Sequence, residues 1–405
     1  MDDITIGARL RTLRRWRGMT QQELADLAGV SPSFVSMVEH GTRLLDRRSH
    51  ISALASALRV SETDLVGGPH LSADRLQADP HTGIPALRVS LQTNSLSRPA
   101  VDRARPLPEL HREVFGTIEL KRRACDYVGV GQSLPPAIDQ LYRHAAHPAD
   151  EAAQQLALTT LVEACVIASS VARGLNYMDL AFLAAQRAEE AAGLLDDPVQ
   201  KGKADFMWLH ALPRTGSWDR NLAAAEQAAS DLEPYAREPL DFQVLGMLTL
   251  TAALSAASMQ RADIAAQWLD QAAQIAARIP DEPVSNWQSF SATNVGIWRV
   301  SVGVERGEGG GTMLELAADV AVDRLAITPS RQADFCADVG RGLAREPRTR
   351  AEAVRWLRRA ESAAPQRIRN SAPVRETVAY LLGRATATAG GRELRGMAAR
   401  MGVPH

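Results

Sequence analysis

The sequence has few aromatic residues and few cysteines. Phe, Trp and Tyr together make up 5% of the 405 residues, and Cys125, Cys165 and Cys336 lie far apart without a C-x-x-C spacing. Isolated cysteines argue against zinc sites and disulfide frameworks. Because residues that suit strands are the minority while Ala and Leu are abundant, the composition predicts an all-α protein.

Net charge is also nearly absent. The 46 basic and 47 acidic residues leave a formal charge of -1 at pH 7, with lysine only at Lys121, Lys201 and Lys203. Such a balance provides no overall attraction to nucleic acid. Any DNA binding must therefore depend on a local basic patch.

The N-terminus lacks the hydrophobic core of a signal peptide, which predicts a cytoplasmic protein. One uncharged stretch, residues 242–260, is long enough to cross a membrane. Its Thr, Ser and Gly content predicts a buried helix of a helical body instead, so no membrane partner is expected.

Motifs for catalysis and metal binding are missing. The nine histidines form no H-E-x-x-H pair, and no acid or cysteine near His144 and His147 completes a metal site. The GEGGG stretch at residues 307–311 lacks the Lys and Ser/Thr of a phosphate-binding loop. The sequence therefore predicts a protein that is not an enzyme and holds no metal or cofactor.

The N-terminal residues predict a compact group of helices. Ile6, Leu10 and Leu13 recur at the spacing of an amphipathic helix, which Gly18 ends. Thr20 then begins T-Q-Q-E, a capping box in which hydroxyl and carboxylate each satisfy a backbone N–H. A second, short helix follows directly.

The second and third helices are predicted to meet across a minimal turn. Gly29 supplies the left-handed conformation that stops the helix over residues 21–28. Ser31 and Pro32 then begin a helix over residues 32–40 as its N-cap and first residue. The remaining predicted helices are residues 50–58 and 61–65.

The stretch TQQELADLAGVSPSFVSMVEHG, with the upstream R-x-L-R-x-x-R-G-M, resembles the XRE (Cro/CI-type) family of helix-turn-helix regulators. The resemblance covers nearly all of residues 4–68 and implies that the third helix enters the major groove of double-stranded DNA. It also implies a structural ion pair between Arg14 and Glu39. The DNA-contacting positions implied are Gln21, Ser31, Pro32, Ser33, Phe34, Ser36, Met37, Arg43, Arg47 and Arg48.

Gln21 and the three arginines of this set are expected at phosphates, where they supply the local basic patch. The family often has Gln, Asn or Arg where this sequence has Pro32, Ser33 and Met37, and those longer side chains read bases with two hydrogen bonds. Few direct hydrogen bonds to bases are therefore expected, and the shape of the DNA is expected to contribute more of the specificity.

The rest of the chain predicts a linker and a helical body. Residues 69–108 are rich in Gly, Pro, Ser and His and predict a linker with one short helix at residues 84–93. From residue 109 to residue 405, helices follow one another between Pro and Gly breaks. Small and large residues recur at the spacing of tetratricopeptide second helices at Ala353, Leu357, Ala360 and Pro365, at Ala265, Leu269 and Ala272, and loosely at Leu222, Ala229 and Pro234.

This region resembles a degenerate tetratricopeptide (TPR) solenoid of five or six hairpins, with an irregular loop at residues 305–312. An irregular all-helical domain is the alternative. Stacked repeats create a concave groove that takes extended peptides. The candidate groove residues are Asn294, Trp298, Trp208, Leu250 and Asp338.

Within that groove, Asn294 can hold a peptide backbone through one donor and one acceptor, and Trp298 can pack a side chain. The alternative is that Asn294 joins hairpins and Trp298 belongs to the core. The whole architecture, residues 1–68 as an HTH domain and residues 109–405 as a sensor and dimerisation domain, resembles bacterial regulators that respond to signalling peptides.

The predicted function is thus a homodimeric transcriptional regulator whose effector, a peptide or a small molecule, controls the spacing of two recognition helices. The competing prediction is a DNA-binding adaptor whose solenoid recruits a protein partner without a diffusible ligand.

Overall fold

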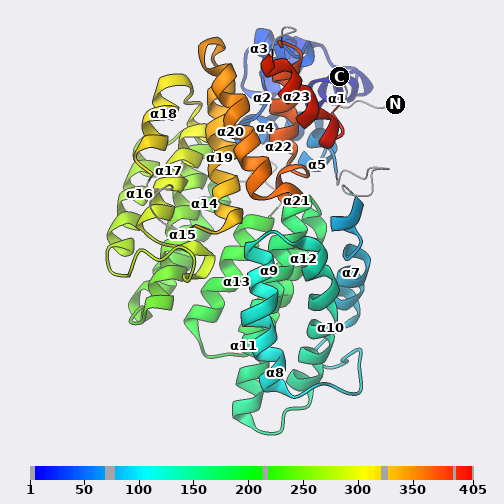
Figure 1. Ribbon diagram of the computed structural model, residues 1–405, viewed down its shortest axis with the longest axis vertical. Helices are drawn as coiled ribbons and strands as arrows, with labels where there is room; N and C mark the ends of the chain where they lie inside the picture. The colour runs from blue at the N-terminus through cyan, green and yellow to red at the C-terminus, as the bar shows by residue number, and fades with distance from the viewer. Residues whose placement is uncertain (1–4, 69–77, 213–217, 321–326, 386–388, 404–405) are drawn as a thin grey trace.

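A head of five helices lies on one end of a larger helical body (Figure 1). Within the part of the chain described, every regular element is a helix. The computed structural model describes residues 5–68, 78–212, 218–320, 327–385 and 389–403.

The head begins and ends its helices where the sequence signals predict. Thr20 and Glu23 form the capping box, and Gly29 has a left-handed φ of 64° after the second helix. Leu10, Leu24 and Val35 are completely buried and build a core separate from that of the body. The head helices are α1 (Ile6–Trp16), α2 (Gln21–Ala28), α3 (Pro32–Glu39), α4 (Arg48–Leu58) and α5 (Glu62–Val66).

The body consists of seven successive helical hairpins in the described residues, at least one more than the sequence predicts. Each is a first helix followed by an antiparallel second helix. The first hairpin joins α8 (Leu107–Arg112), a π-helical segment (Glu113–Ile118) and α9 (Glu119–Arg123) to α10 (Tyr127–Ala146). The others are α11 (Glu151–Gly174) with α12 (Met178–Ala192), α13 (Pro198–Ala211) with α14 (Trp218–Leu232), α15 (Pro239–Ser258) with α16 (Ala262–Ala276), α17 (Ala292–Arg306) with α18 (Gly310–Ala318), α19 (Pro329–Ala344) with α20 (Arg350–Ala363), and α22 (Ala372–Leu382) with α23 (Ala389–Arg400).

Successive first helices contact one another, which is the arrangement of a TPR-like solenoid. The pattern of small and large residues recognised in the sequence lies on second helices, as predicted. On α20, the small Ala353 and Ala360 and the large Leu357 are completely buried. Opposite them, a Cβ added to Gly340 would lie only 2.8 Å from Cγ of Leu357. A glycine on α19 therefore permits the close approach of this hairpin.

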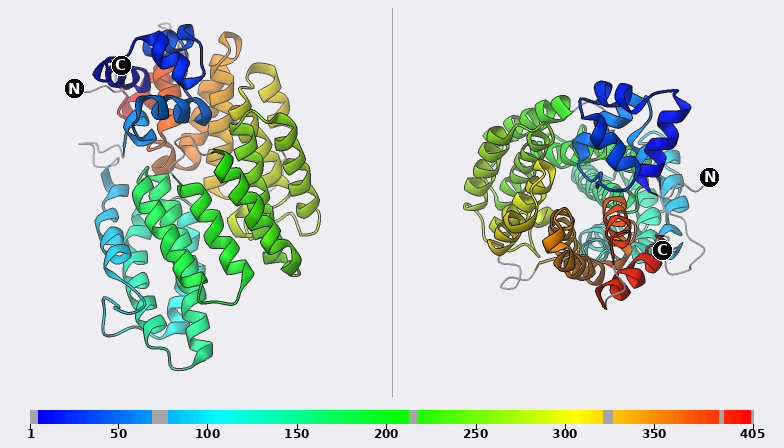
Figure 2. Two further views of the ribbon diagram at one scale, coloured as in Figure 1. Left: turned by 180° about the vertical axis from the view of Figure 1, so that it is seen from behind. Right: turned by 90° about the horizontal axis from the view of Figure 1, so that it is seen from above.

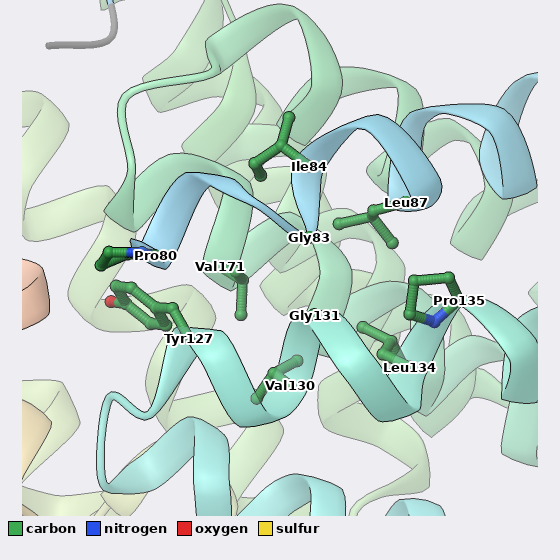
Figure 3. Close-up of a pocket in the computed structure, with 10 residues that line it drawn as sticks. All are labelled: Pro80, Gly83, Ile84, Leu87, Tyr127, Val130, Gly131, Leu134, Pro135 and Val171. Atoms are coloured by element: carbon green, nitrogen blue, oxygen red, sulfur yellow. The ribbon is translucent and has the colours of Figure 1, made fainter. Parts of the chain in front are cut away.

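The predicted linker helix belongs to the body. Helix α7 (Ile84–Thr93) packs on α10, with Ile84, Leu87 and Leu91 in the core of the body. Figure 3 shows Gly83 and Gly131 where the two elements cross, and the cavity that remains beside them is only about 10 Å³. This packing leaves no room there for an effector.

The solenoid returns to its own beginning. The short helix α21 (Pro365–Ile368) reaches the start of α10, where Oε1 of Gln366 accepts the backbone N–H of Tyr127 at 2.8 Å. Nearby, the ring of His81 is within 2.9 Å of Oδ1 of Asn370. Seen from above, the body consequently curves into a nearly closed ring, with the head covering one side (Figure 2).

Two sequence expectations bear on the body's helices. Two helices are long and apolar enough to cross a membrane, α11 and α15, and both are mostly buried inside the body. The second contains the uncharged stretch 242–260 up to Ser258, so the prediction of a buried helix is confirmed. The irregular loop predicted at residues 305–312 is shorter than predicted and spans residues 307–309, because α17 continues to Arg306 and α18 begins at Gly310.

Candidate nucleic-acid interface and effector site

Helix α3 exposes a narrow polar face. Ser31 caps the helix by accepting the N–H of Phe34 at 3.2 Å, and Ser33 is exposed beside it. Pro32, Ser36 and Met37 are half-buried, so parts of their side chains remain accessible. These positions form the face that the family resemblance assigns to the major groove.

Phe34, in contrast, points into the head. It is 5% exposed, and its ring meets that of His50 edge-on at 4.8 Å between centroids. The guanidinium of Arg43 lies over the same ring at 5.0 Å, while Arg43 itself remains exposed. Phe34 therefore supports α3 and orients Arg43 from inside the head.

The carboxylate of Glu39 connects the first three helices of the head, α1, α2 and α3. Arg14 donates to both oxygens of Glu39, at 2.6 and 2.9 Å, and Gln21 donates to Oε2 at 2.8 Å. Burial alone would raise the pKa of Glu39, but these hydrogen bonds lower it below its usual value. Gln21, the predicted phosphate ligand, is thereby held at the start of α2.

Arg47 and Arg48 contact the body. Nε of Arg47 donates to the carbonyl of Glu305 at 2.9 Å, in the last turn of α17. The carboxylate of Glu305 accepts the backbone N–H of Arg48 at 2.9 Å and lies 3.6 Å from its guanidinium. In this arrangement, two of the three arginines expected at phosphates are used within the chain.

Asp46, directly before these arginines, is 4% exposed and is held by α19. Arg345 donates to its Oδ2 at 2.7 and 3.1 Å, and Arg341 donates to its backbone carbonyl at 2.8 Å. The loop between α3 and α4 is therefore bound by both backbone and side-chain contacts.

Further contacts involve the last hairpin. Oε1 of Glu376 accepts the backbone N–H of Ile6 at 2.8 Å and lies 3.5 Å from Arg9. Burial raises the pKa of this carboxyl to about 7, although Arg9 acts in the opposite direction. Arg384 donates to the carbonyl of Gly41 at 3.0 Å. The head is thus docked on α17, α19 and α22.

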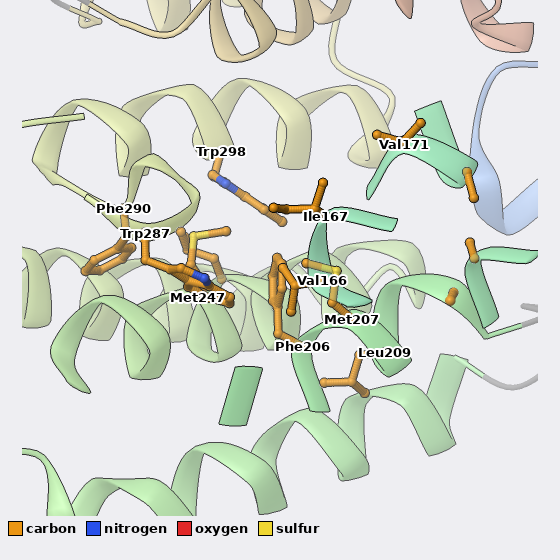
Figure 4. Close-up of a cluster of buried hydrophobic side chains, with 14 of the residues drawn as sticks. Val166, Ile167, Val171, Phe206, Met207, Leu209, Met247, Trp287, Phe290 and Trp298 are labelled. Atoms are coloured by element: carbon orange, nitrogen blue, oxygen red, sulfur yellow. The ribbon is translucent and has the colours of Figure 1, made fainter. Parts of the chain in front are cut away.

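All five candidate groove residues lie on first helices, but they are not equally accessible. Leu250 is completely buried within α15 and Trp298 is 6% exposed, packing against His210. Figure 4 places Trp298 beside Ile167 in the apolar cluster. Leu250 in particular belongs to the core, because the inner side of α15 is covered by neighbouring first helices.

Of the other three candidates, Asn294 and Asp338 are hydrogen-bonded within the body. Asn294 is completely buried, and its Oδ1 accepts Nε of Arg331 at 3.0 Å. Asp338 is half-buried, accepting Ser301 at 2.6 Å and Arg341 at 2.7 Å, while Trp208 is half-buried. Asn294 thus joins two hairpins, as the alternative sequence interpretation expects.

The charged residues beside Asn294 are not among the candidates that the sequence predicts. Arg331 and Asp334 lie one turn apart on α19, and Arg367 reaches them from α21. The helical spacing of Arg331, Asp334 and Asp338 could have indicated a common face of α19. Nothing in the sequence places Arg367 there.

Comparison with known proteins supports the assignment of the head. Residues 5–66 match the family model described as a helix-turn-helix domain. No curated protein matches the chain. Among solved structures, it is similar to a crystal structure of Bacillus thuringiensis PlcR in complex with the peptide PapR7 and DNA, with 12% identity, 78% of this chain and 93% of that chain covered, and a TM-score of 0.32.

A likeness at that level carries neither the peptide nor the DNA geometry of the other protein over to this chain. The capped helices, the left-handed Gly29 and the matched family model all concern the head. The seven hairpins define the body. The chain therefore joins an N-terminal helix-turn-helix domain, of the kind that binds DNA, to a TPR-like solenoid.

Proposed function

We propose that this protein is a DNA-binding transcriptional regulator whose body restrains the head until an effector binds. The observation that carries the proposal is that two arginines at the start of α4 have two competing partners, DNA and the body. Arg47 and Arg48 are expected at DNA phosphates, and both contact Glu305 of the body. The Arg47 side chain that donates to the body is not available to a phosphate, and the Arg48 guanidinium is drawn toward the carboxylate of Glu305.

The docking surface has a favourable electrostatic basis. Glu305 lies in the last turn of α17, where the carbonyls of a helix end carry partial negative charge. Arg47 and Arg48 bring positive charge to that end, which DNA phosphates would otherwise attract. Head docking and DNA binding therefore compete for the same cations.

The effector acts by changing the balance between docked and released heads. A ligand that prefers the body in its released form shifts the population by its difference in affinity for the two forms. A short peptide along the first helices of the solenoid is the effector that this architecture suits best. In a homodimer, release of two heads places recognition helices about 34 Å apart on a palindromic site.

The test begins with selection of bound DNA from a genomic pool by full-length protein carrying Asp46→Asn, which removes the charge that Arg345 holds and so releases the head without an effector. A palindromic site is expected for a homodimer. On that site, Arg43→Ala should weaken binding to all sequences similarly, because Arg43 is exposed and expected at a phosphate. Ser33→Ala should change the base preference instead, since Ser33 is exposed on α3.

The matched control is Arg299→Ala, which removes an exposed arginine paired with Asp270 on the body. It should leave DNA binding unchanged. Absence of any enriched DNA site would overturn the proposed function, and equal effects of Arg43→Ala and Ser33→Ala would overturn the division between phosphate and base contacts.

A further inference from the structure

Two arginines share one carboxylate where the end of the solenoid returns to its beginning. Arg367 donates to Oδ1 of Asp334 at 2.7 Å and to Oδ2 at 3.1 Å, so it uses both oxygens of the carboxylate. Arg331 reaches the same Oδ2 only at 3.3 Å. The carboxylate is therefore committed mainly to Arg367.

This group of three side chains carries one excess positive charge. Burial and then the neighbouring Arg367 lower the pKa of Arg331, against the opposite effects of Asp334 and Asp338, and Asp338 is itself paired with Arg341. The close contact with Asp334 keeps the pKa of Arg367 raised. Arg173 adds further positive potential at Asp334. A desolvated cation without a full counter-charge is costly, so the site favours an additional anion.

Arg331 is also positioned to donate to a ligand. Its side chain keeps 18% of its surface exposed, and that of Arg367 keeps 22%. Nε of Arg331 donates to Asn294 and Nη1 to Asp334, and Nη2 makes no hydrogen bond to any described residue. Asn294 therefore fixes the guanidinium while one edge of it remains available.

An unpaired donor lies close by. Trp298 is only 6% exposed, and its buried indole N–H has no hydrogen-bond partner among the described residues. Its ring centroid is 5.8 Å from the guanidinium carbon of Arg331. Buried donors are normally satisfied, so an unpartnered N–H on a ring beside this cation is suited to an acceptor from a ligand.

We propose that Arg331 and Arg367 bind the carboxylate of the effector, with Asn294 as the residue that positions Arg331. This inference rests on the proposed function, in which the body binds an effector. One negative charge neutralises the excess, and planar carboxylates match the two donors of a guanidinium edge. A doubly charged phosphate would exceed the available positive charge and be repelled by Asp334.

The site and the docked head share one helix. Arg331 lies in the first turn of α19, and Arg345, which holds Asp46, follows its last turn. Their separation of 14 positions corresponds to about 21 Å along a rigid helix. A carboxylate that draws Arg331 toward itself would shift the same element that holds the head.

The carboxylate can belong to a peptide C-terminus or to a small organic acid, and the experiment separates these sources. Full-length protein is exposed to a heptapeptide library with free C-termini and to the same library with C-terminal amides. A second arm compares phenylacetate with phenylacetamide. Retained compounds are identified by mass spectrometry, and their affinities are measured by calorimetry.

We expect retention of the acids over the matching amides, and binding at least tenfold weaker in Arg331→Gln. Arg331→Lys should recover part of the loss, because it restores the charge without the planar edge. Asp334→Asn should strengthen acid binding, since it removes the competing negative charge. The control Arg299→Gln should bind like the unmodified protein.

Equal retention of acids and amides, retention of neither, or unchanged affinity in Arg331→Gln would overturn the carboxylate site. The opposite signs expected for Arg331→Gln and Asp334→Asn distinguish binding from loss of folding, which would weaken both. DNA binding is measured separately without any ligand on full-length Asp46→Asn protein, because the proposed function expects the unmodified head to stay restrained until an effector binds. Failure of DNA binding overturns the proposed function, whereas failure of the ligand arms alone overturns only this inference.

Discussion

Arg345 holds Asp46 through two hydrogen bonds, 2.7 Å from Nη2 and 3.1 Å from Nε to the same carboxylate oxygen. The two residues are almost three hundred positions apart, in the last part of the solenoid and in the loop after α3. Arg345 also donates to the carbonyl of Val304 at 2.8 Å. The pair thus joins the DNA-binding head to the ends of two first helices.

Asp46→Asn should release the head. The substitution keeps the size of the side chain but removes the charge that Arg345 holds, and buried charged hydrogen bonds of this kind are worth about 1.5–3 kcal/mol. We expect affinity for the selected DNA site to rise roughly tenfold without effector, as measured by fluorescence anisotropy. Asp26→Asn, an exposed substitution on α2, is the control; equal affinity of the two variants would contradict docking as a restraint.

Glu39→Gln should destabilise the head. It leaves the guanidinium of Arg14, 11% exposed, without its charged partner. Removing one partner of a buried pair costs about 3–5 kcal/mol. Hydrogen exchange of amides in α1 to α4 of the full-length protein should increase accordingly, while amides of α15 remain unchanged. Protection equal to that of the unmodified protein would show that the pair contributes little.

Docking of the head should weaken as pH rises from about 4.5 to about 7. The pKa of Glu376 is about 7 when docked, against 4.5 for an ordinary glutamate. Between these values the docked form binds more protons, so acidification favours docking and alkalinisation opposes it. The free energy of docking should change by about 3 kcal/mol at most between these two pH values. A fluorescence-transfer pair, with one dye on the head and one on the body, measures the docked fraction.

Glu376→Gln is the control for this titration. His50, whose pKa burial lowers to about 4, contributes a trend of the opposite sign, because the released form binds its proton first on acidification. The informative quantity is therefore the difference in docked fraction, at each pH, between the unmodified protein and Glu376→Gln. Identical pH profiles would mean that Glu376 does not respond to docking.

Gly340→Ala should destabilise the body. The added methyl group would lie 2.8 Å from Cγ of Leu357 and 3.2 Å from the carbonyl of Ala353. Overpacking of this kind costs about 1–3 kcal/mol, measurable as a lower urea midpoint. Gly311→Ala is the matched control, because nothing lies within 4 Å of its added methyl group. Equal midpoints would contradict the close approach of α19 and α20.

Local signals allowed much of the fold to be predicted. The capping box at Thr20, the left-handed Gly29 and the small Ala353 and Ala360 each act through neighbours a few residues away or on the adjoining helix. The loop predicted at residues 305–312 is confined to residues 307–309, because the last two glycines of the GEGGG stretch do not extend it. Instead Gly310 adopts a φ of 52° and begins α18.

The outward face of α3 was also predictable, because helix spacing sets which residues face away from the core. The assignment of that face to DNA comes from the family resemblance. The environment of the candidate groove residues was only partly predictable. Leu250 and Asn294 were placed on the correct helices, but the sequence does not say how closely neighbouring first helices pack, and that packing buries both completely.

The sequence by itself thus determined an all-helical chain, a helix-turn-helix head and the second helices of the repeats, because caps, turns and small residues act over short range. Only the tertiary structure decided that Asp46 contacts Arg345, that Arg47 contacts Glu305, and that Arg367 contacts Asp334. Such contacts depend on the summed curvature of seven hairpins. No residue near any of these positions in the chain specifies that curvature.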